Sequence, residues 1–438
     1  MTESDNAALV VVGAGPAGLA AAMAAAEAGV DVLLLDAAPA AGGQIWRARR
    51  GVPVRPVARA CTRLARAGVR VLAGARVTMA LPDRTLLVDA PQGARRVRWQ
   101  RLVLATGARE RLLPFPGWTL PGVFGAGGLQ ALVKGGWPVD GQRVVVAGSG
   151  PLLLASAATL RGEGARIAGL AEEADAARFG AALARHPAKL LQATRLGIVL
   201  AGVPWLHGWR VVAAEGDGCV EQVRLAKGGR TRTIACDALA AGWGLVPQTE
   251  LGQALGCAIA PRFGAEALAV DDAQRTNVDG VFAVGECAGV AGAVAAQLQG
   301  EIAGRAVAAE LVDAGAVPAS LVKRLAREHA FAAAVATTFA PPPGWRDRLR
   351  DDTLVCRCED VPWSALRDQP DLRAAKLATR CGMGHCQGRL CHDALASTMH
   401  WARLPQRAPL APAPLATLLA CTSETDANPD TDLVHQET

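Results

Sequence analysis

A glycine-rich pattern near the start of the chain restricts its fold more than any other feature. The apolar run Leu9–Val12 leads directly into a segment that fits G-x-G-x-x-G. In this pattern the first glycine makes a tight turn, the second lets backbone approach a pyrophosphate, and the third lets the helix pack closely on the strand. The helix N-terminus then offers unpaired N–H groups to the phosphates. The candidate dinucleotide-binding residues of this loop are Gly13, Gly15, Pro16, Ala17 and Gly18.

The residues that follow supply the context that this loop needs. Leu19 to Gly29 is alanine-rich and predicts a helix, and Val30 to Leu35 predicts a second strand that ends at Asp36. Asp36 lies at the spacing at which an acidic side chain binds the ribose hydroxyls of an adenine dinucleotide. We therefore expect an α/β dinucleotide-binding domain at the N-terminus.

A second copy of the pattern occurs in the middle of the chain. A strand before Gly148-Ser149-Gly150-Pro151 repeats the opening motif, although Leu153 replaces the third glycine. Glu172 follows the next predicted strand and is a candidate ribose partner. An acid at that position favours NAD or ATP over NADP. The alternative is a remnant fold with an empty site.

Composition excludes several classes of function. The 438 residues suffice for two or three domains, and the net charge of +6 is dispersed, so we expect no nucleic-acid partner. Polar residues interrupt the apolar stretches, so we expect no transmembrane segment. Of the 11 cysteines, five lie between Cys356 and Cys391, which indicates a metal site in a reducing, cytoplasmic compartment rather than a disulfide framework.

Three further segments resemble those of the flavoproteins with two dinucleotide-binding domains, which include thioredoxin reductase and ferredoxin reductases. A Gly-Gly-Gln loop follows the second strand, an Ala-Thr-Gly segment ends a later strand, and an apolar strand leads into Gly-Glu near residue 285. The resemblance implies FAD at the first loop, with Glu286 in the place of the aspartate that accepts a hydrogen bond from the ribityl chain. The implied FAD-site residues are Gly43, Gln44, Ala105, Thr106, Gly107, Gly285 and Glu286.

The cysteine-rich segment contains a C-x-C pair, which suits two thiolates on one metal centre. A [2Fe-2S] cluster or an all-cysteine zinc site needs four sulfurs, and the spacing leaves open whether the second pair is Cys386 and Cys391 or Cys381 and Cys386. The whole pattern is similar to the bacterioferritin-associated-ferredoxin type of [2Fe-2S] domain. That resemblance implies an additional thiol at Cys381 and a ligand set of Cys356, Cys358, Cys386 and Cys391.

Over nearly its whole length the chain resembles the large FAD subunits of bacterial amine and imino-acid dehydrogenases. These include the A-type subunit of opine oxidase, the α subunit of D-hydroxyproline dehydrogenase and the B-type subunit of hydrogen cyanide synthase. The resemblance implies electron relay through FAD and a [2Fe-2S] cluster, beside an amino-acid-oxidase-like FAD subunit and a small ferredoxin-like subunit. No residue is assigned as catalytic. The alternatives are a free-standing NADH:acceptor reductase and, less favoured, a non-catalytic nucleotide-binding scaffold.

The expected fold is therefore α/β, with two Rossmann-like domains, one inserted in the other, and a small cysteine-rich iron–sulfur domain. We expect disorder beyond Cys421. The expected boundaries are 1–107 and 245–312 for the FAD domain, 108–244 for the second nucleotide domain, 313–344 for a helical segment and proline linker, 345–400 for the [2Fe-2S] domain, and 401–438 for a tail.

Overall fold

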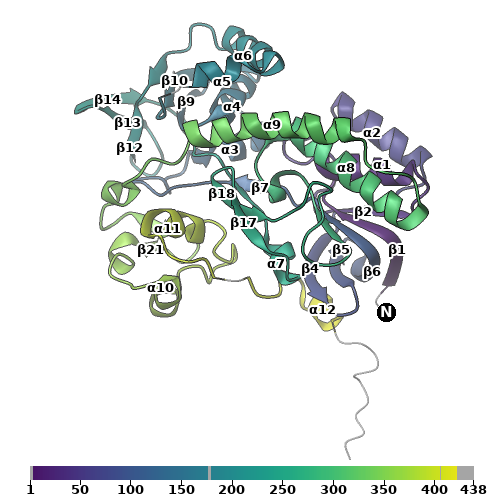
Figure 1. Ribbon diagram of the computed structural model, residues 1–438. Coiled ribbons are helices and arrows are strands. Elements are labelled where there is room, and N and C mark those ends of the chain that lie inside the picture. The colour runs from purple at the N-terminus through teal and green to yellow at the C-terminus, as the bar shows by residue number, and fades with distance from the viewer. Residues whose placement is uncertain (1–2, 176–178, 405, 422–438) are drawn as a thin grey trace, which may run out of the picture.

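The computed structural model describes residues 3–175, 179–404 and 406–421. They form two α/β units and a smaller cysteine-containing region beside them (Figure 1). The predicted fold class, with two Rossmann-like sheets, is confirmed. The expectation of disorder beyond Cys421 concerns residues outside the described ranges.

The first sheet is organised around the strand that precedes the opening glycine loop. Its order is β3-β2-β1-β6-β5-β4, and β19 pairs in parallel with β6. The chain thus leaves this sheet after β6 and returns to it much later. Apolar side chains fill both faces, because the central strands are buried on each side. The strands are β1 (Glu3–Val12), β2 (Val32–Asp36), β3 (Arg70–Ala73), β4 (Arg76–Leu81), β5 (Thr85–Ala90), β6 (Gly93–Leu104) and β19 (Val281–Ala283).

Small residues allow two helices to pack closely on this unit. Gly300 and Gly304 of α8 face α1, where an added Cβ would overlap the carbonyl oxygens of Ala17 and Ala21. This close contact holds the late-returning segment against the opening helix. The helices and hairpin of this unit are α1 (Pro16–Ala26), α2 (Arg55–Arg66), α7 (Glu250–Ala254), the 3-10 helix η2 (Gly285–Ala288), α8 (Gly292–Val312), β17 (Ile259–Arg262) and β18 (Ala265–Leu268).

The second unit has a five-stranded sheet of order β11-β10-β9-β15-β8, and its strands are parallel. A three-stranded antiparallel sheet, β12-β13-β14, extends from it. The elements are β8 (Val123–Gly125), α3 (Ala126–Lys134), β9 (Arg143–Gly148), α4 (Pro151–Gly162), β10 (Arg166–Glu172), α5 (Gly180–Ala184), α6 (Pro187–Val199), β11 (Trp205–His207), β12 (Arg210–Glu215), β13 (Gln222–Lys227), β14 (Arg230–Ala235) and β15 (Ala238–Gly242).

Two short strands connect the units, and one long helix crosses between them. β7 (Ala108–Glu110) pairs with β16 (Leu245–Pro247) where the chain leaves and re-enters the first unit. The long helix α9 (Ala319–Thr338) runs beside α8 towards the second unit (Figure 1). The cysteine region and tail contain η3 (Trp345–Arg348), β20 (Leu354–Cys356), β21 (Val361–Pro362), η4 (Trp363–Ala365), α10 (Leu372–Thr379), α11 (Cys391–Met399) and α12 (Leu415–Leu419).

Candidate functional site

The first glycine loop is closely packed at its base and open at its tip. A Cβ at Gly13 would overlap the Ala105 carbonyl oxygen, and a Cβ at Gly18 would overlap the Gly13 carbonyl oxygen. Pro16 occupies the first turn of α1, where its missing N–H removes no helix hydrogen bond. At Gly15 the nearest atom to an added Cβ is the Cα of Gly43, at 3.9 Å. Close packing therefore requires glycine at the first and third positions of the motif. At the second position the backbone faces free space, as a phosphate loop requires.

The Gly-Gly-Gln loop lies directly against this first loop. The Gly42 N–H donates to the Ala14 carbonyl oxygen at 2.8 Å, and a Cβ at Gly43 would lie 3.1 Å from the Gly15 Cα. The side chain of Gln44 is exposed and accepts hydrogen bonds from Arg47. Backbone without side chains therefore lines the space beside the first loop, and such a cradle fits a pyrophosphate.

Asp36 ties the end of β2 to the same loop. Its two carboxylate oxygens accept hydrogen bonds from the backbone N–H groups of Ala14, at 2.5 Å, and Ala38, at 2.7 Å. Burial raises the pKa of this carboxyl, although the two hydrogen bonds and Arg47 oppose that shift. Asp36 is therefore held at the mouth of the loop, where the sequence predicts a ribose partner.

The segments near residues 105 and 285 meet beside the first loop. The Val284 N–H donates to the Leu104 carbonyl oxygen at 2.9 Å, and a Cβ at Gly285 would lie 2.8 Å from the Ala17 Cβ. The Thr106 hydroxyl donates to the Gln248 carbonyl oxygen at 2.7 Å, while the backbone N–H of Gln248 donates to Gly107. Burial raises the pKa of the Glu286 carboxyl. The structure thus brings the Ala-Thr-Gly and Gly-Glu segments together beside the first glycine loop.

Two buried side chains at this junction carried no signal in the sequence. Cys287 is fully buried, and its Sγ lies 3.3 Å from the Leu104 carbonyl oxygen. Gln299 of α8 accepts a hydrogen bond from the Gly285 N–H at 3.1 Å through its Oε1. Both follow the Gly-Glu motif in an alanine-rich stretch, where a single cysteine or glutamine has no recognisable spacing to other site residues.

The second glycine loop is satisfied and covered by residues of the chain itself. Glu172 accepts hydrogen bonds from the backbone N–H groups of Gly150, at 2.9 Å, and Ala174, at 2.8 Å, and burial raises the pKa of its carboxyl. A Cβ at Gly150 would lie 3.8 Å from the Cβ of Phe339, the residue that directly follows α9. The ring of Phe339 packs against Phe179, with centroids 5.3 Å apart. The Cβ of an aromatic residue therefore lies beside this loop.

The cysteine region gathers five thiols. The sulfurs of Cys356, Cys381 and Cys391 lie within 4.8 Å of one another, and all three residues are buried. Hydrogen bonds from Cys381 and Cys391 lower the pKa of the Cys356 thiol. Cys358 lies next to Cys386, since the two thiols share a hydrogen bond. Buried, converging sulfur donors fit an iron–sulfur cluster or zinc. The structure thus places Cys381, which family resemblance left outside the ligand set, beside two of its predicted members.

Buried ion pairs fasten this cysteine region to the first unit. Arg109 donates to Glu250 at 2.6 Å, to Asp393 at 2.8 Å and to the carbonyl oxygen of Arg389 at 3.0 Å. Arg389 lies in the loop between Cys386 and Cys391. Removing one member of a buried ion pair is costly, because it leaves the other charge unpaired. These contacts therefore stabilise the docking of the cysteine region on the first unit.

Tryptophans add contacts between the cysteine region and the second unit. The indole N–H of Trp345 donates to the Pro114 carbonyl oxygen at 2.7 Å, and that of Trp118 donates to the Leu354 carbonyl oxygen at 2.5 Å. Trp345 is buried against Trp243, with ring centroids 4.9 Å apart. The proline-containing segment before Trp345 thus leads into a docked region.

Comparison with known proteins agrees with this geometry. Residues 7–300 match the family model described as pyridine nucleotide-disulphide oxidoreductase. The chain is 34% identical to the HcnB subunit of hydrogen cyanide synthase from Pseudomonas aeruginosa over 87% of this chain and 90% of the relative. It is also 34% identical to the A-type subunit of opine oxidase from Agrobacterium tumefaciens, over 90% of this chain and 86% of the relative.

Solved structures with low sequence identity show the same fold. L-proline dehydrogenase from P. horikoshii matches with a TM-score of 0.70 at 20% identity, covering 95% of this chain and 80% of that one. Thioredoxin reductase from T. acidophilum matches with a TM-score of 0.52 at 21% identity, covering 70% and 98%. Within the described residues, no helix has the length and apolar character needed to cross a bilayer. The chain belongs to the pyridine nucleotide-disulphide oxidoreductase family, as an FAD-dependent oxidoreductase subunit of the type that includes HcnB and the A-type subunit of opine oxidase.

Proposed function

We propose that this chain is the electron-relay subunit of a multi-subunit amine or imino-acid dehydrogenase. FAD would bind along the first glycine loop, and the cysteine region would hold a [2Fe-2S] cluster. A separate amino-acid-oxidase-like FAD subunit would oxidise the substrate, with a small ferredoxin-like subunit as a further partner. The relatives named as subunits of hydrogen cyanide synthase and opine oxidase support a multi-subunit assembly.

The observation that carries this proposal is the buried connection between the flavin-binding unit and the cysteine region. Arg109 follows the Ala-Thr-Gly segment by two residues and reaches both Glu250 and Asp393. Asp393 lies on α11, two residues after Cys391. One side chain therefore links the edge of the proposed FAD site to the helix that begins at a cluster cysteine.

Each part of the chain would have a defined role in this relay. The glycine cradle would bind the FAD pyrophosphate, Asp36 the adenosine ribose, and the buried Glu286 the ribityl side. FAD accepts two electrons, and an iron–sulfur cluster transfers one at a time. The predicted cluster ligands are Cys356, Cys358, Cys386 and Cys391. The protein would fix the position of both groups and adjust their potentials through burial and hydrogen bonds.

A free-standing NADH:acceptor reductase is the alternative, and the repeated glycine loop is the observation that favours it. Phe339 opposes it, since this residue lies beside the second loop, whereas the first loop has only backbone beside it. The deciding experiment compares the purified chain alone with the chain co-expressed with the product of a neighbouring amino-acid-oxidase-like gene.

We expect substrate-dependent dye reduction only from the complex, and slow flavin bleaching by NADH in the chain alone. Oxidation of opines, hydroxyproline or glycine by the chain alone would contradict the division of labour. Rapid bleaching by NADH would favour the reductase.

Serine substitutions test the ligand set of the cluster. We expect Cys358→Ser and Cys386→Ser to lose most of the bound iron and acid-labile sulfide, because each substitution removes one of the four thiolate ligands. Cys381→Ser should retain both. Iron and sulfide analysis, with electron paramagnetic resonance of the reduced protein, gives the readout. A Cys381→Ser variant without iron, beside an iron-loaded Cys358→Ser variant, would assign the buried triad as the ligands instead.

A further inference from the structure

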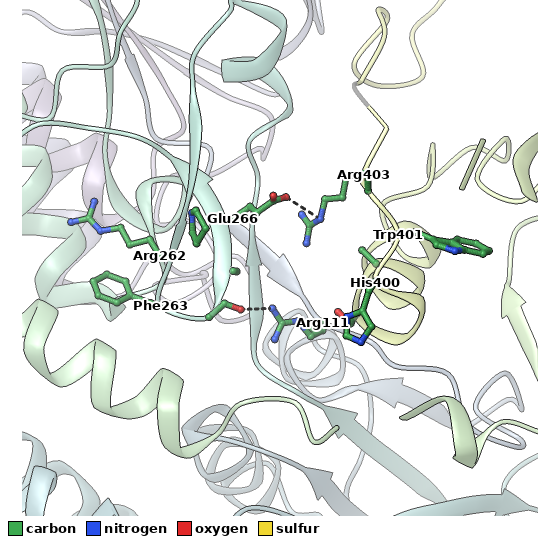
Figure 2. A pocket seen from close by; sticks show the side chains of 13 residues that line it. Arg111, Arg262, Phe263, Glu266, His400, Trp401 and Arg403 are labelled. Atoms are coloured by element: carbon green, nitrogen blue, oxygen red, sulfur yellow. Dashed lines mark hydrogen bonds and ion pairs between the residues drawn. The ribbon is translucent and has the colours of Figure 1, made fainter. Parts of the chain in front are cut away.

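A cavity of about 590 Å³ lies between the β17–β18 hairpin and the C-terminal end of α11 (Figure 2). One wall belongs to the flavin-binding unit, where Arg262 donates to the carbonyl oxygen of Ala288 at 3.0 Å. The other wall belongs to the helix that begins at Cys391. The volume is within the range of small-molecule sites. The polar lining side chains are Arg111, Arg262, Glu266, Ser397, His400 and Arg403.

Arg111 is the side chain that points to a ligand. It is 8% exposed, and it donates one hydrogen bond from Nη2 to the Gly264 carbonyl oxygen at 3.2 Å. Its buried Nε has no hydrogen-bond partner among the described residues. Burial lowers the pKa of the Arg111 guanidinium, and the nearby Arg403 adds to that effect while Asp393 opposes it. Because a guanidinium has five N–H donors and stays charged near neutral pH, Arg111 keeps donors beyond its one hydrogen bond to Gly264, and a bound anion would accept from them.

The other charges around the cavity restrict the kind of anion. Arg403 is held by Asp393 at 2.9 Å and by Glu266 at 3.4 Å. The guanidinium of Arg262 is directed away from the cavity, towards Ala288 and His329 (Figure 2). The Glu266 carboxylate in the wall would repel a dianion. One guanidinium beside one carboxylate therefore suits a single carboxylate group better than a phosphate.

We propose that this cavity binds a small organic carboxylate, whose oxygens accept hydrogen bonds from the Arg111 guanidinium in its wall. The site is separate from the proposed FAD and cluster residues, and it does not depend on the relay function. A ligand there would lie between the segment that follows Glu286 and the helix that follows Cys391. A bound carboxylate would touch both proposed redox regions and would therefore affect the contact between them.

Calorimetric titration of the full chain, at constant ionic strength, tests the proposal with acetate, proline and inorganic phosphate as probes. We expect saturable binding of a carboxylate and none of phosphate. In Arg111→Met the carboxylate should bind roughly 10- to 100-fold more weakly, because a charge-assisted hydrogen bond is lost. The matched control is Arg373→Met, since Arg373 is exposed on α10 outside the cavity. Binding of phosphate alone, or equal carboxylate affinity in Arg111→Met, would overturn the proposal.

A second variant decides the matter if Arg111→Met does not fold, which thermal unfolding would reveal. Glu266→Gln removes the only carboxylate among the cavity-lining residues and frees Arg403 from one partner. We expect this variant to bind acetate more tightly than the unmodified chain does. Unchanged or weaker acetate binding would contradict a carboxylate site, whether or not the relay function holds.

Discussion

In the first unit, backbone without side chains flanks the glycine loop, whereas in the second unit Phe339 lies over it and Glu172 bonds to its Gly150 N–H. Asp36 and Glu172 stand at corresponding strand ends, yet the longer glutamate reaches the second glycine while the aspartate reaches the residue before it. Leu153 also replaces the third glycine and is fully buried in the core of the second unit. The same motif can therefore remain open to a nucleotide or be closed by its own chain, depending on what surrounds it.

The strongest test of this comparison transfers the leucine of the second loop into the first. Gly18→Leu would overlap the Gly13 carbonyl oxygen, which belongs to backbone and cannot rotate away. We expect loss of nearly all bound FAD and a fall of about 3 kcal/mol in the free energy of unfolding, as overpacked sites show. Flavin absorbance and urea unfolding measure both effects.

The matched control for this substitution is Gly162→Ala at the end of α4, where an added Cβ meets nothing within 4 Å. That variant should keep its flavin and its stability. If Gly18→Leu retained full flavin content, the close packing at the base of the first loop would not be a requirement for FAD.

A second test opens the second loop. Phe339→Ala keeps the Cβ near Gly150 but removes the ring that packs on Phe179. We expect NADH or ATP to bind about tenfold more tightly than to the unmodified chain, which corresponds to about 1.4 kcal/mol. Phe331→Ala is the control, because its ring contacts Phe179 in the same aromatic group but is not the residue next to Gly150. Calorimetric titration with each nucleotide gives the readout. Equal affinities in all three proteins would show that Phe339 does not limit access.

Local sequence predicted the parts of the molecule that local physics determines. The strand, glycine loop and helix around Gly13 and Gly18 follow from residues adjacent in the chain, and so does their repeat near Gly148. The meeting of Gly285 with Ala17 joins segments far apart in the chain, and only family resemblance anticipated it. No pattern connects Phe339 with Gly150, because a single aromatic residue at a helix end has no periodicity to reveal its contact.

The same limit applies to the cysteine region. The spacing of its cysteines predicted a metal site, but the choice among five thiols depends on how loops fold in space. Arg109 and Arg111 likewise looked like ordinary dispersed basic residues. Their partners, Asp393 and Gly264, come from distant segments, so their burial could be read only from the structure.

The smallest expected effect concerns the acid that bonds to the second loop. Because burial raises the pKa of Glu172, the folded state holds its proton more tightly than the unfolded state, whose pKa lies near 4.5. Glu172 therefore makes its full contribution to the free energy of unfolding below about pH 4.5, and this contribution is lost as the pH rises through the folded pKa. Glu172→Gln should remove this contribution to the pH slope, while other acids whose pKa burial raises, such as Asp36, keep theirs. It should also lower the free energy of unfolding by about 1 kcal/mol at pH 4, because an amide can accept from only one of the two N–H groups, and this difference should shrink as the pH rises and Glu172 ionises. Urea unfolding from pH 4 to pH 8, with the exposed Glu221→Gln as control, measures the difference. A slope in Glu172→Gln equal to that of the unmodified chain would mean that the second loop is not closed by this carboxyl, and that Phe339 alone distinguishes it from the first.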